Sequence, residues 1–312
     1  MSRQFPWLSD PNWNTSLDTG AGVSPSIQKL IEFRLRGSGG LFGPGIVLDN
    51  NPVLAVAFAP YLGHTGPVFR MRTGPYGNRV EADVYNTVGS GEYKTISGWQ
   101  EPYAGTKHLV KWYNQGSGAD LVNTTVDGTG DYTKLPPLYN DNKGWYCDGE
   151  ETNYMYTEDD TTLSSRTYFS TLLSIKTSAD STNTEQTIFG EGSSGGGPAI
   201  FIQNSGNDIG ALKVHPTNYK PCEVWQNSVH LGVKQVFNNF TYRPDDYLLS
   251  MIGQSDNYPI THVMYGRYNI QGAIRNRYFN GSVRNFVTYS AELSSALTQE
   301  IRDGMMNQYS LT

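Results

Sequence analysis

The sequence predicts an all-β protein, an antiparallel β-sandwich that ends in one short helix. Three observations support this prediction. Glycine (34 residues) and tyrosine (21 residues) are abundant, which favours tight turns and strands over long helices. Charged residues make up only 17% of the chain, below the usual value of about 25%. Strand-like segments recur every ~8–15 residues with turn residues between them, and a chain of 312 residues can bury a substantial core.

The strands are expected where apolar residues alternate with polar ones or form short continuous runs. At 109–113, this alternation places Val110 and Trp112 on one face of a strand. Leu109 and Lys111 then lie on the opposite face. The other strands are expected at 53–59 (a buried strand or a short helix), 67–72, 80–85, 168–175, 198–203, 228–237 and 262–268.

Two segments near the end of the sequence have specific signals. Asn280 and Gly281 stand between two strand-like runs, and Asn-Gly predicts a two-residue hairpin turn because both of its central residues need positive φ. The final segment has the period of an amphipathic helix. Its apolar stripe consists of Leu297, Ile301 and Met305. Either Ser294 or Ser295 can be its N-cap.

The first 50 residues differ in composition from the rest, so we expect two parts. Residues 1–50 are predicted to be an N-terminal arm or anchoring segment, and residues 51–312 the sandwich. Pro and Gly interrupt the arm, and 26–35 fits a helix and a strand equally well. The arm could be a tail that packs on the domain or an anchor in a larger assembly, and both alternatives are left open.

The charge and the cysteines exclude several classes of function. The net charge is −6 and no Lys/Arg-rich run is present, so no nucleic-acid partner is expected. Cys147 and Cys222 stand outside any zinc-binding spacing, and their pairing is left open. Glu158, Asp159 and Asp160 could hold Ca²⁺, but the Asp-x-Asp-x-Asp-Gly spacing of a calcium loop is absent. We therefore expect no metal and no cofactor, with a Ca²⁺ site left open. No apolar stretch approaches the ~18 residues of a membrane span, so no membrane insertion is expected. The first residues lack the pattern of a signal peptide, which predicts synthesis in a cytoplasm.

Residues 109–121 read Leu-Val-Lys-Trp-Tyr-Asn-Gln-Gly-Ser-Gly-Ala-Asp-Leu. They resemble Trp-Tyr-Asp-Gln-Ser-Gly-Asn-Gly-Asn, a hallmark of concanavalin A-like β-sandwiches. That family includes the catalytic domain of fungal α-L-arabinofuranosidases, laminin-G-like lectin modules and many phage particle proteins. Segments at 60–72, 135–155 and 280–294 resemble the same family in the family's order. The resemblance spans residues 52–312 and implies a concanavalin A-like jelly-roll fold.

The resemblance also implies where a catalytic pair would stand. The arabinofuranosidases of this family carry the nucleophilic Glu in an Asp-x-Glu motif on a strand, and the acid, an Asp, before the final strands. The matching positions here hold Gln203 and Ser205, and no Asp stands near Tyr268. An amide and a hydroxyl cannot replace a carboxylate nucleophile, so no catalytic residues are expected. Glu191 and Asp256 are the alternative carboxylates to test.

Aromatic residues in polar, Pro-containing segments are candidates for binding sugars. A ring can cover the C–H face of a sugar while neighbouring amides and carboxylates bond its hydroxyls. The candidate glycan-binding residues are Tyr219, Trp225, Asp256 and Tyr258. The same rings could instead pack over loops or against neighbouring subunits, and this alternative stays open.

The expected function is that of a non-enzymatic virion protein, a capsid decoration, fibre or tail component. Such a protein would attach to other capsid or tail proteins through residues 1–50 and form a homo-oligomer. It would display the sandwich, with host-surface glycans as a secondary ligand. The alternatives are an arabinofuranosidase-like glycoside hydrolase that degrades polysaccharides and a stand-alone lectin.

Overall fold

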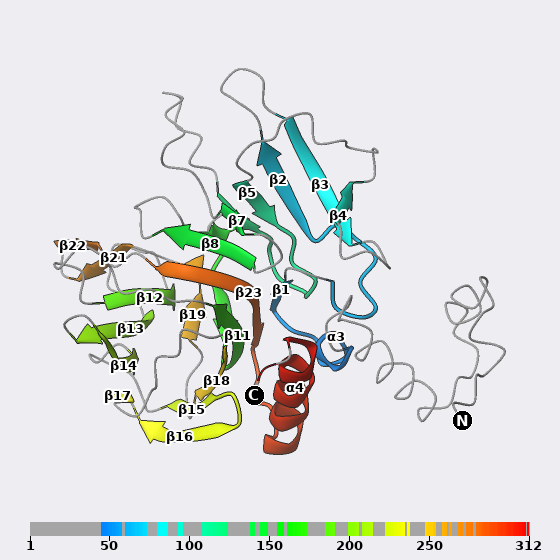
Figure 1. Cartoon of the computed structure of the whole chain (residues 1–312). Coiled ribbons are helices and arrows are strands. Elements are labelled where there is room, and N and C mark those ends of the chain that lie inside the picture. Colours follow the sequence, from blue (N-terminus) through cyan, green and yellow to red (C-terminus); the bar gives the residue numbers. More distant parts are fainter. Residues whose placement is uncertain are drawn as a thin grey trace, which may run out of the picture.

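The structure is a computed structural model of the chain (Figure 1). Most of what it describes is β-strand, with two helices. The described residues are 45–57, 60–73, 80–86, 93–95, 108–123, 138–140, 144–148, 155–158, 161–173, 185–190, 199–205, 208–214, 222–234, 236–237, 247–253, 258–260, 262–263, 267–270, 273–276, 279–309 and 311.

The elements of these segments follow in chain order. The helices are α3 (Ile46–Asp49) and α4 (Ser295–Tyr309). The strands are β1 (Leu54–Ala57), β2 (Phe69–Thr73), β3 (Val80–Asn86), β4 (Tyr93–Thr95), β5 (His108–Trp112), β6 (Leu121–Val122), β7 (Leu138–Asn140), β8 (Gly144–Asp148), β9 (Met155–Thr157), β10 (Leu163–Ser165), β11 (Thr167–Leu173), β12 (Glu185–Gly190), β13 (Ala199–Ser205), β14 (Asp208–Val214), β15 (Cys222–Gln226), β16 (Val229–Lys234), β17 (Val236–Phe237), β18 (Tyr247–Gly253), β19 (Tyr258–Ile260), β20 (His262–Val263), β21 (Arg267–Ile270), β22 (Ala273–Asn276) and β23 (Asn280–Tyr289).

The strands form two layers. In the first layer the long strand β23 is central, with β11 along one edge and β1 and β8 sharing the other. Strands β18, β15 and β16 continue beyond β11. The second layer is paired in the order β4–β3–β2–β5–β6–β9–β20–β12–β13–β14–β17. All these pairings are antiparallel, and β7 joins the layers by pairing with both β5 and β8. The predicted antiparallel β-sandwich with a C-terminal helix is therefore confirmed.

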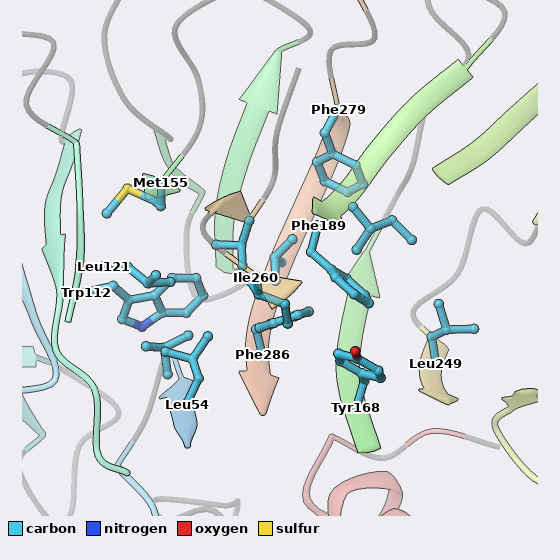
Figure 2. Packing of buried hydrophobic residues seen from close by; sticks show 14 of the residues in the cluster. Leu54, Trp112, Leu121, Met155, Tyr168, Phe189, Leu249, Ile260, Phe279 and Phe286 are labelled. Atoms are coloured by element: carbon cyan, nitrogen blue, oxygen red, sulfur yellow. The ribbon is translucent and has the colours of Figure 1, made fainter. Parts of the chain in front are cut away.

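The two layers bury one apolar core between them. Phe189 of β12 stacks on Tyr168 of β11 with 4.7 Å between the ring centroids, and its centroid lies 5.0 Å from that of Phe286 in β23. Burial of side chains of this size stabilises a fold by about 1.5–3 kcal/mol each. Figure 2 shows further side chains of both layers turned toward one another, among them Leu54, Trp112, Leu121 and Met155.

A second core lies on the opposite face of the first layer, under the two helices. The period of two in β1 decides which core a residue enters: Leu54 faces the inner core and Ala55 the core under the helices. Helix α4 packs Ile301 and Met305 onto this face, as its spacing predicts. All residues of β18 are buried because both of its faces are covered.

Specific hydrogen bonds fix the start of helix α4 and hold helix α3 against the sheet. The Ser294 hydroxyl accepts from the backbone N–H of Leu297 at 3.3 Å, which confirms Ser294 as the N-cap. The Tyr289 hydroxyl donates to the carbonyl of Val47 at 3.0 Å, and Val47 is buried. Residues 45–50 therefore belong to the folded unit, and the prediction of an arm now rests on residues 1–44, which lie outside the described residues.

The predicted faces of strand β5 are wrong in one respect. Arg70 of β2 pairs with Lys111, but the next residue of β2, Met71, pairs with Leu109, so Val110 is a bulged residue. Leu109 and Trp112 consequently both face the inner core, each 0% exposed. A bulge takes one residue out of the alternation, and the local pattern of this segment does not reveal it.

The predicted hairpin turn at Asn280–Gly281 is also wrong. Both residues lie in the continuous strand β23, where they pair with Asp148 and Cys147 of β8. Neither has positive φ. Pairing with β8 stabilises the extended backbone here, and it outweighs the local preference of Asn-Gly for a turn. A positive φ of 53° occurs instead at Asn227, between β15 and β16.

Two findings concern cysteine and membranes. Cys222 is a buried free thiol, so it forms no disulfide with Cys147. Burial raises the pKa of the Cys222 thiol to about 12, which leaves it protonated and unreactive at neutral pH. Within the residues that the structure describes, no helix is long and apolar enough to cross a membrane.

Candidate functional site

The hallmark segment after β5 forms a turn that is bonded to the open edge of β1. The Asn114 side-chain oxygen accepts from the backbone N–H of Ala55 at 2.7 Å and from that of Gly116 at 2.9 Å. The Asn114 amide group donates to the carbonyl of Val53 at 2.8 Å. A carboxylate could accept the same two bonds but could not donate the third. The amide in place of the family's Asp therefore fits a structural role.

The neighbouring residues of the turn serve the same purpose. Gln115 bonds to the N–H of Tyr61 through its side-chain oxygen at 2.7 Å. The Trp112 indole N–H donates to the carbonyl of Ala57 at 2.8 Å. A Cβ atom at Gly116 would lie 2.4 Å from the carbonyl oxygen of Pro52, so only glycine allows this approach. Trp112, Asn114, Gln115 and Gly116 of the hallmark therefore hold the scaffold together.

The positions where the resemblance implies catalytic carboxylates lie in regular strands. Gln203 and Ser205 are two residues apart in β13. Gln203 is the register partner of Glu185 in β12, and Ser205 is that of Asp208 in β14. Tyr268 lies in β21.

The structure describes two of the four predicted glycan-binding residues. Tyr219 and Asp256 lie outside the described residues. Tyr258 begins β19 and pairs with Ser165, but its side chain is not among those described. Trp225 lies in β15. Because only Trp225 has a described side chain, the glycan site that these four residues would form stays a prediction.

The Trp225 ring is engaged within the chain. The guanidinium carbon of Arg302 in α4 lies 4.1 Å from the ring centroid, and the His230 ring centroid lies 4.5 Å away. The indole N–H donates to Glu223 at 3.1 Å, and Glu223 also contacts His230 at 3.2 Å. Burial lowers the pKa of Arg302. A sugar could stack on Trp225 only if Arg302 or His230 moved away.

A polar cluster that the sequence did not single out covers the outer face of the second layer. It consists of Arg70, Asp83, Lys111, Tyr113, Asp120 and Glu158, and we call it the outer network.

The first half of the outer network is centred on Asp83. Arg70 donates to Asp83 through Nε at 2.7 Å and through a terminal nitrogen at 3.1 Å, and the Tyr113 hydroxyl donates to the same carboxylate at 2.7 Å. The hydrogen bond from Arg70 holds the pKa of Asp83 below its usual value. Burial and the bond to Asp83 raise the pKa of Tyr113.

The second half is centred on Lys111. Its ammonium group lies 2.8 Å from Asp120 and 2.9 Å from Glu158, and 5.3 Å from the centroid of the Tyr113 ring. Burial lowers the pKa of Lys111, but the bonds to the two carboxylates outweigh it, so the pKa ends above its usual value. The network is therefore charged and fixed at neutral pH.

The sequence contained only part of the signal for this cluster. Alternation predicts that Arg70 and Arg72 share the outer face of β2, and the structure confirms this. Their partners Asp83 and Glu81 follow from the pairing of β2 with β3, which no local pattern gives. Among the described residues, no group of three or more His, Cys, Asp and Glu side chains could hold a metal ion.

Comparison with known proteins adds information on the fold. No protein-family model and no curated protein matches the chain. An arabinofuranosidase in complex with arabinofuranosyl-α-1,2-xylobiose is similar in structure, with a TM-score of 0.50 and 14% identity, and the match covers 86% of this chain and 65% of that one. A GH54 α-L-arabinofuranosidase soaked with a cyclic sulfate inhibitor matches over the same shares with a TM-score of 0.45 and 12% identity. The chain thus spans less than two thirds of either neighbour's length, and the first likeness establishes a shared β-sandwich fold.

Proposed function

We propose that the chain is a non-catalytic structural component of a virus particle that displays a β-sandwich. The observation that carries the non-catalytic part is the identity of Gln203 and Ser205 in β13. A retaining glycosidase needs two carboxyl groups about 5–5.5 Å apart, one of which forms the covalent glycosyl intermediate. Neither an amide nor a hydroxyl can take that role at these positions.

The role in a particle rests on the resemblance to phage particle proteins in four segments of the sequence. The chain would attach to capsid or tail proteins through its N-terminal segment, assemble as a homo-oligomer and present the sandwich outward. The bonds of the Asn114 side chain to Ala55 in β1 and of the Gln115 side chain to the N–H of Tyr61 are consistent with this role, because they use the hallmark to close the scaffold. Fold alone does not determine function, so the proposal requires a direct test.

The test locates the chain on particles. Particles produced with an epitope-tagged copy are labelled with gold-conjugated antibody and imaged by negative stain, and the same particles with an untagged copy serve as the control. We expect label at a constant position on most tagged particles. Absence of label from every particle, with the tagged chain present in the lysate, would contradict the proposal.

An arabinofuranosidase-like hydrolase is the second candidate, and one observation favours it. Glu185 is the cross-strand partner of Gln203, and Asp208 that of Ser205, so a carboxylate residue stands beside each replaced position. Directly opposed residues have Cβ atoms about 4.5–5.5 Å apart on the same face of a sheet. Either residue could replace the lost nucleophile together with a carboxylate from elsewhere, but the two could not act as a retaining pair, because β12 and β14 lie on opposite sides of β13, about 9.6 Å apart.

Hydrolysis assays separate the two candidates. The full chain is incubated with 4-nitrophenyl α-L-arabinofuranoside and with a panel of plant and bacterial polysaccharides, and released nitrophenol and reducing sugar are measured. We expect no release above that of a heat-denatured sample. Release that is lost in Glu185→Gln, Glu191→Gln or Asp256→Asn, and kept in the exposed control Glu300→Gln, would establish the hydrolase instead.

A further inference from the structure

Helix α4 covers buried polar groups that have no hydrogen-bond partner within the described part of the chain. These groups are the Ser250 hydroxyl of β18, and the Thr298 hydroxyl and the Nε–H of Arg302 in α4. The three residues are only 0%, 2% and 5% exposed, so bulk water does not pair with these atoms. Buried polar groups in folded proteins are nearly always paired, because an unpaired one destabilises the fold. A partner for these groups is therefore expected under α4.

The three groups lie on the facing surfaces of the helix and the sheet. Thr298 and Arg302 are one turn apart on the same face of α4, since four residues separate them. Ser250 faces the helix, because its register partner Phe169 belongs to the core under the helices. Ser250 also pairs with Trp225, and the guanidinium carbon of Arg302 lies 4.1 Å from the centroid of the Trp225 ring. Because α4 packs beside β18 (Figure 1), all three groups border one small region between these two elements.

The chemistry of this region is that of a site for an anion. The guanidinium of Arg302 can only donate hydrogen bonds, and the hydroxyls of Ser250 and Thr298 can donate as well. Among the residues that the structure describes, no carboxylate forms an ion pair with Arg302. Burial lowers the pKa of Arg302, which reflects the cost of removing this charge from water. The face of the Trp225 ring offsets part of that cost, but the Nε–H still has no acceptor.

We propose that one chloride ion binds between α4 and β18, held by the Nε–H of Arg302 and by the hydroxyls of Thr298 and Ser250. Its charge neutralises the guanidinium, which a water molecule in the same place could not do. Asp303 and Glu223 lie near enough to act on the charge of Arg302, and they would repel a divalent anion more strongly than a monovalent one. A single-atom anion also needs no further donors, whereas each additional oxygen of a buried sulfate or phosphate would need one. The bound ion would fasten the C-terminal helix to the sheet.

Thermal unfolding of the full chain tests this site. The midpoint is compared in sodium chloride, sodium bromide and sodium gluconate at one ionic strength of about 0.15 M, so that general screening is equal. An anion that binds only the folded protein raises the midpoint. We expect midpoints about 2–4 °C higher in chloride and bromide than in gluconate, which corresponds to an anion concentration about tenfold to hundredfold above the dissociation constant.

Three variants locate the effect. Arg302→Met removes the charge and keeps an unbranched side chain over Trp225, so its midpoint should be the same in chloride and in gluconate. Thr298→Val replaces one hydroxyl with a methyl group and should weaken chloride binding about tenfold. The matched control is Arg70→Met, which removes an arginine that is paired with Asp83 and is remote from α4. This control should keep the full difference between chloride and gluconate.

Crystals grown in sodium bromide give the second measurement, because bromide scatters anomalously. We expect an anomalous peak within hydrogen-bonding reach of the Arg302 Nε and the Thr298 hydroxyl. Equal midpoints in chloride and gluconate, a chloride effect that Arg302→Met or Thr298→Val leaves intact, or no bromide peak at this place would each overturn the proposal. A peak without any effect on the midpoint would mark an adventitious ion only and would overturn it too. If Arg302→Met fails to fold, Thr298→Val and the anomalous peak decide, and the labelling of particles is independent of all these results.

Discussion

The bonds of Asn114 allow a prediction about stability that can be worked out from the structure. In Asn114→Ala, the backbone N–H groups of Ala55 and Gly116 lose their acceptor. The carbonyl of Val53 keeps a second bond, from the N–H of Gly118 at 2.8 Å. A buried polar group left unpaired costs about 1–3 kcal/mol. Since the site is only partly buried, we expect the two N–H groups together to lower the free energy of unfolding by about 2–4 kcal/mol.

Two matched variants make the reasoning testable. Asn114→Asp keeps both accepted bonds and loses only the donor to Val53, so it should cost about 1 kcal/mol or less. Ser117→Ala removes a hydroxyl bond of 3.2 Å to the Pro52 carbonyl, which Ser117 N–H also bonds at 2.9 Å, and should cost less than about 0.5 kcal/mol. Urea denaturation followed by tryptophan fluorescence gives all three values. Equal costs for Asn114→Asp and Asn114→Ala would refute the assignment of the stability to the two accepted bonds.

The remaining predictions concern packing, pH and thiol chemistry. Gly116→Ala forces a Cβ atom against the Pro52 carbonyl oxygen, and urea denaturation should show a free energy of unfolding lower by about 1–3 kcal/mol. Met305→Ala leaves a cavity under α4 and should lower the free energy of unfolding by about 2–5 kcal/mol. Because the folded-state pKa of Asp83 is depressed, its stabilising effect is present above the ordinary carboxyl pKa and is lost as the pH falls through the folded value. Asp83→Asn should therefore be less stable than the wild type at pH 6, and the difference between their thermal midpoints should shrink as the pH falls below the ordinary carboxyl pKa of about 4; a constant difference would contradict this. In a Cys147→Ser background, Cys222 should react with Ellman's reagent at pH 8 only after unfolding, and fast reaction of native protein would show that the thiol is accessible.

The sequence predicted those parts of the fold that depend on neighbouring residues. The alternation in β2 and the spacing of Ile301 and Met305 are local, and both gave the correct buried face. The bulge at Val110 is not local, because it depends on how β5 meets β2. Asn280 and Gly281 show the same limit, since partners on β8 hold them extended against their own preference.

For the candidate site too, the sequence singled out some residues and missed others. The resemblance was enough to single out Gln203 and Ser205, because a motif can be compared with the sequence residue by residue. The outer network could not be predicted, because Asp83, Lys111 and Glu158 come from three separate segments that only the strand register brings together. Surface ion pairs of this kind contribute little to stability individually, and they leave no apolar pattern in the sequence.

The closure of the sandwich by β23 has a consequence for the order in which the chain folds. The bond between Tyr289 and Val47 joins residues 242 positions apart, and β23 supplies the edge for β1, β8 and β11 alike. During synthesis those three strands emerge long before their common partner does. Contacts of such high sequence separation slow folding, because the loop must close before they form. The nascent chain must therefore keep these strand edges from pairing with other chains until β23 (Asn280–Tyr289) has left the ribosome, and this interval is the point of greatest exposure to aggregation during its synthesis.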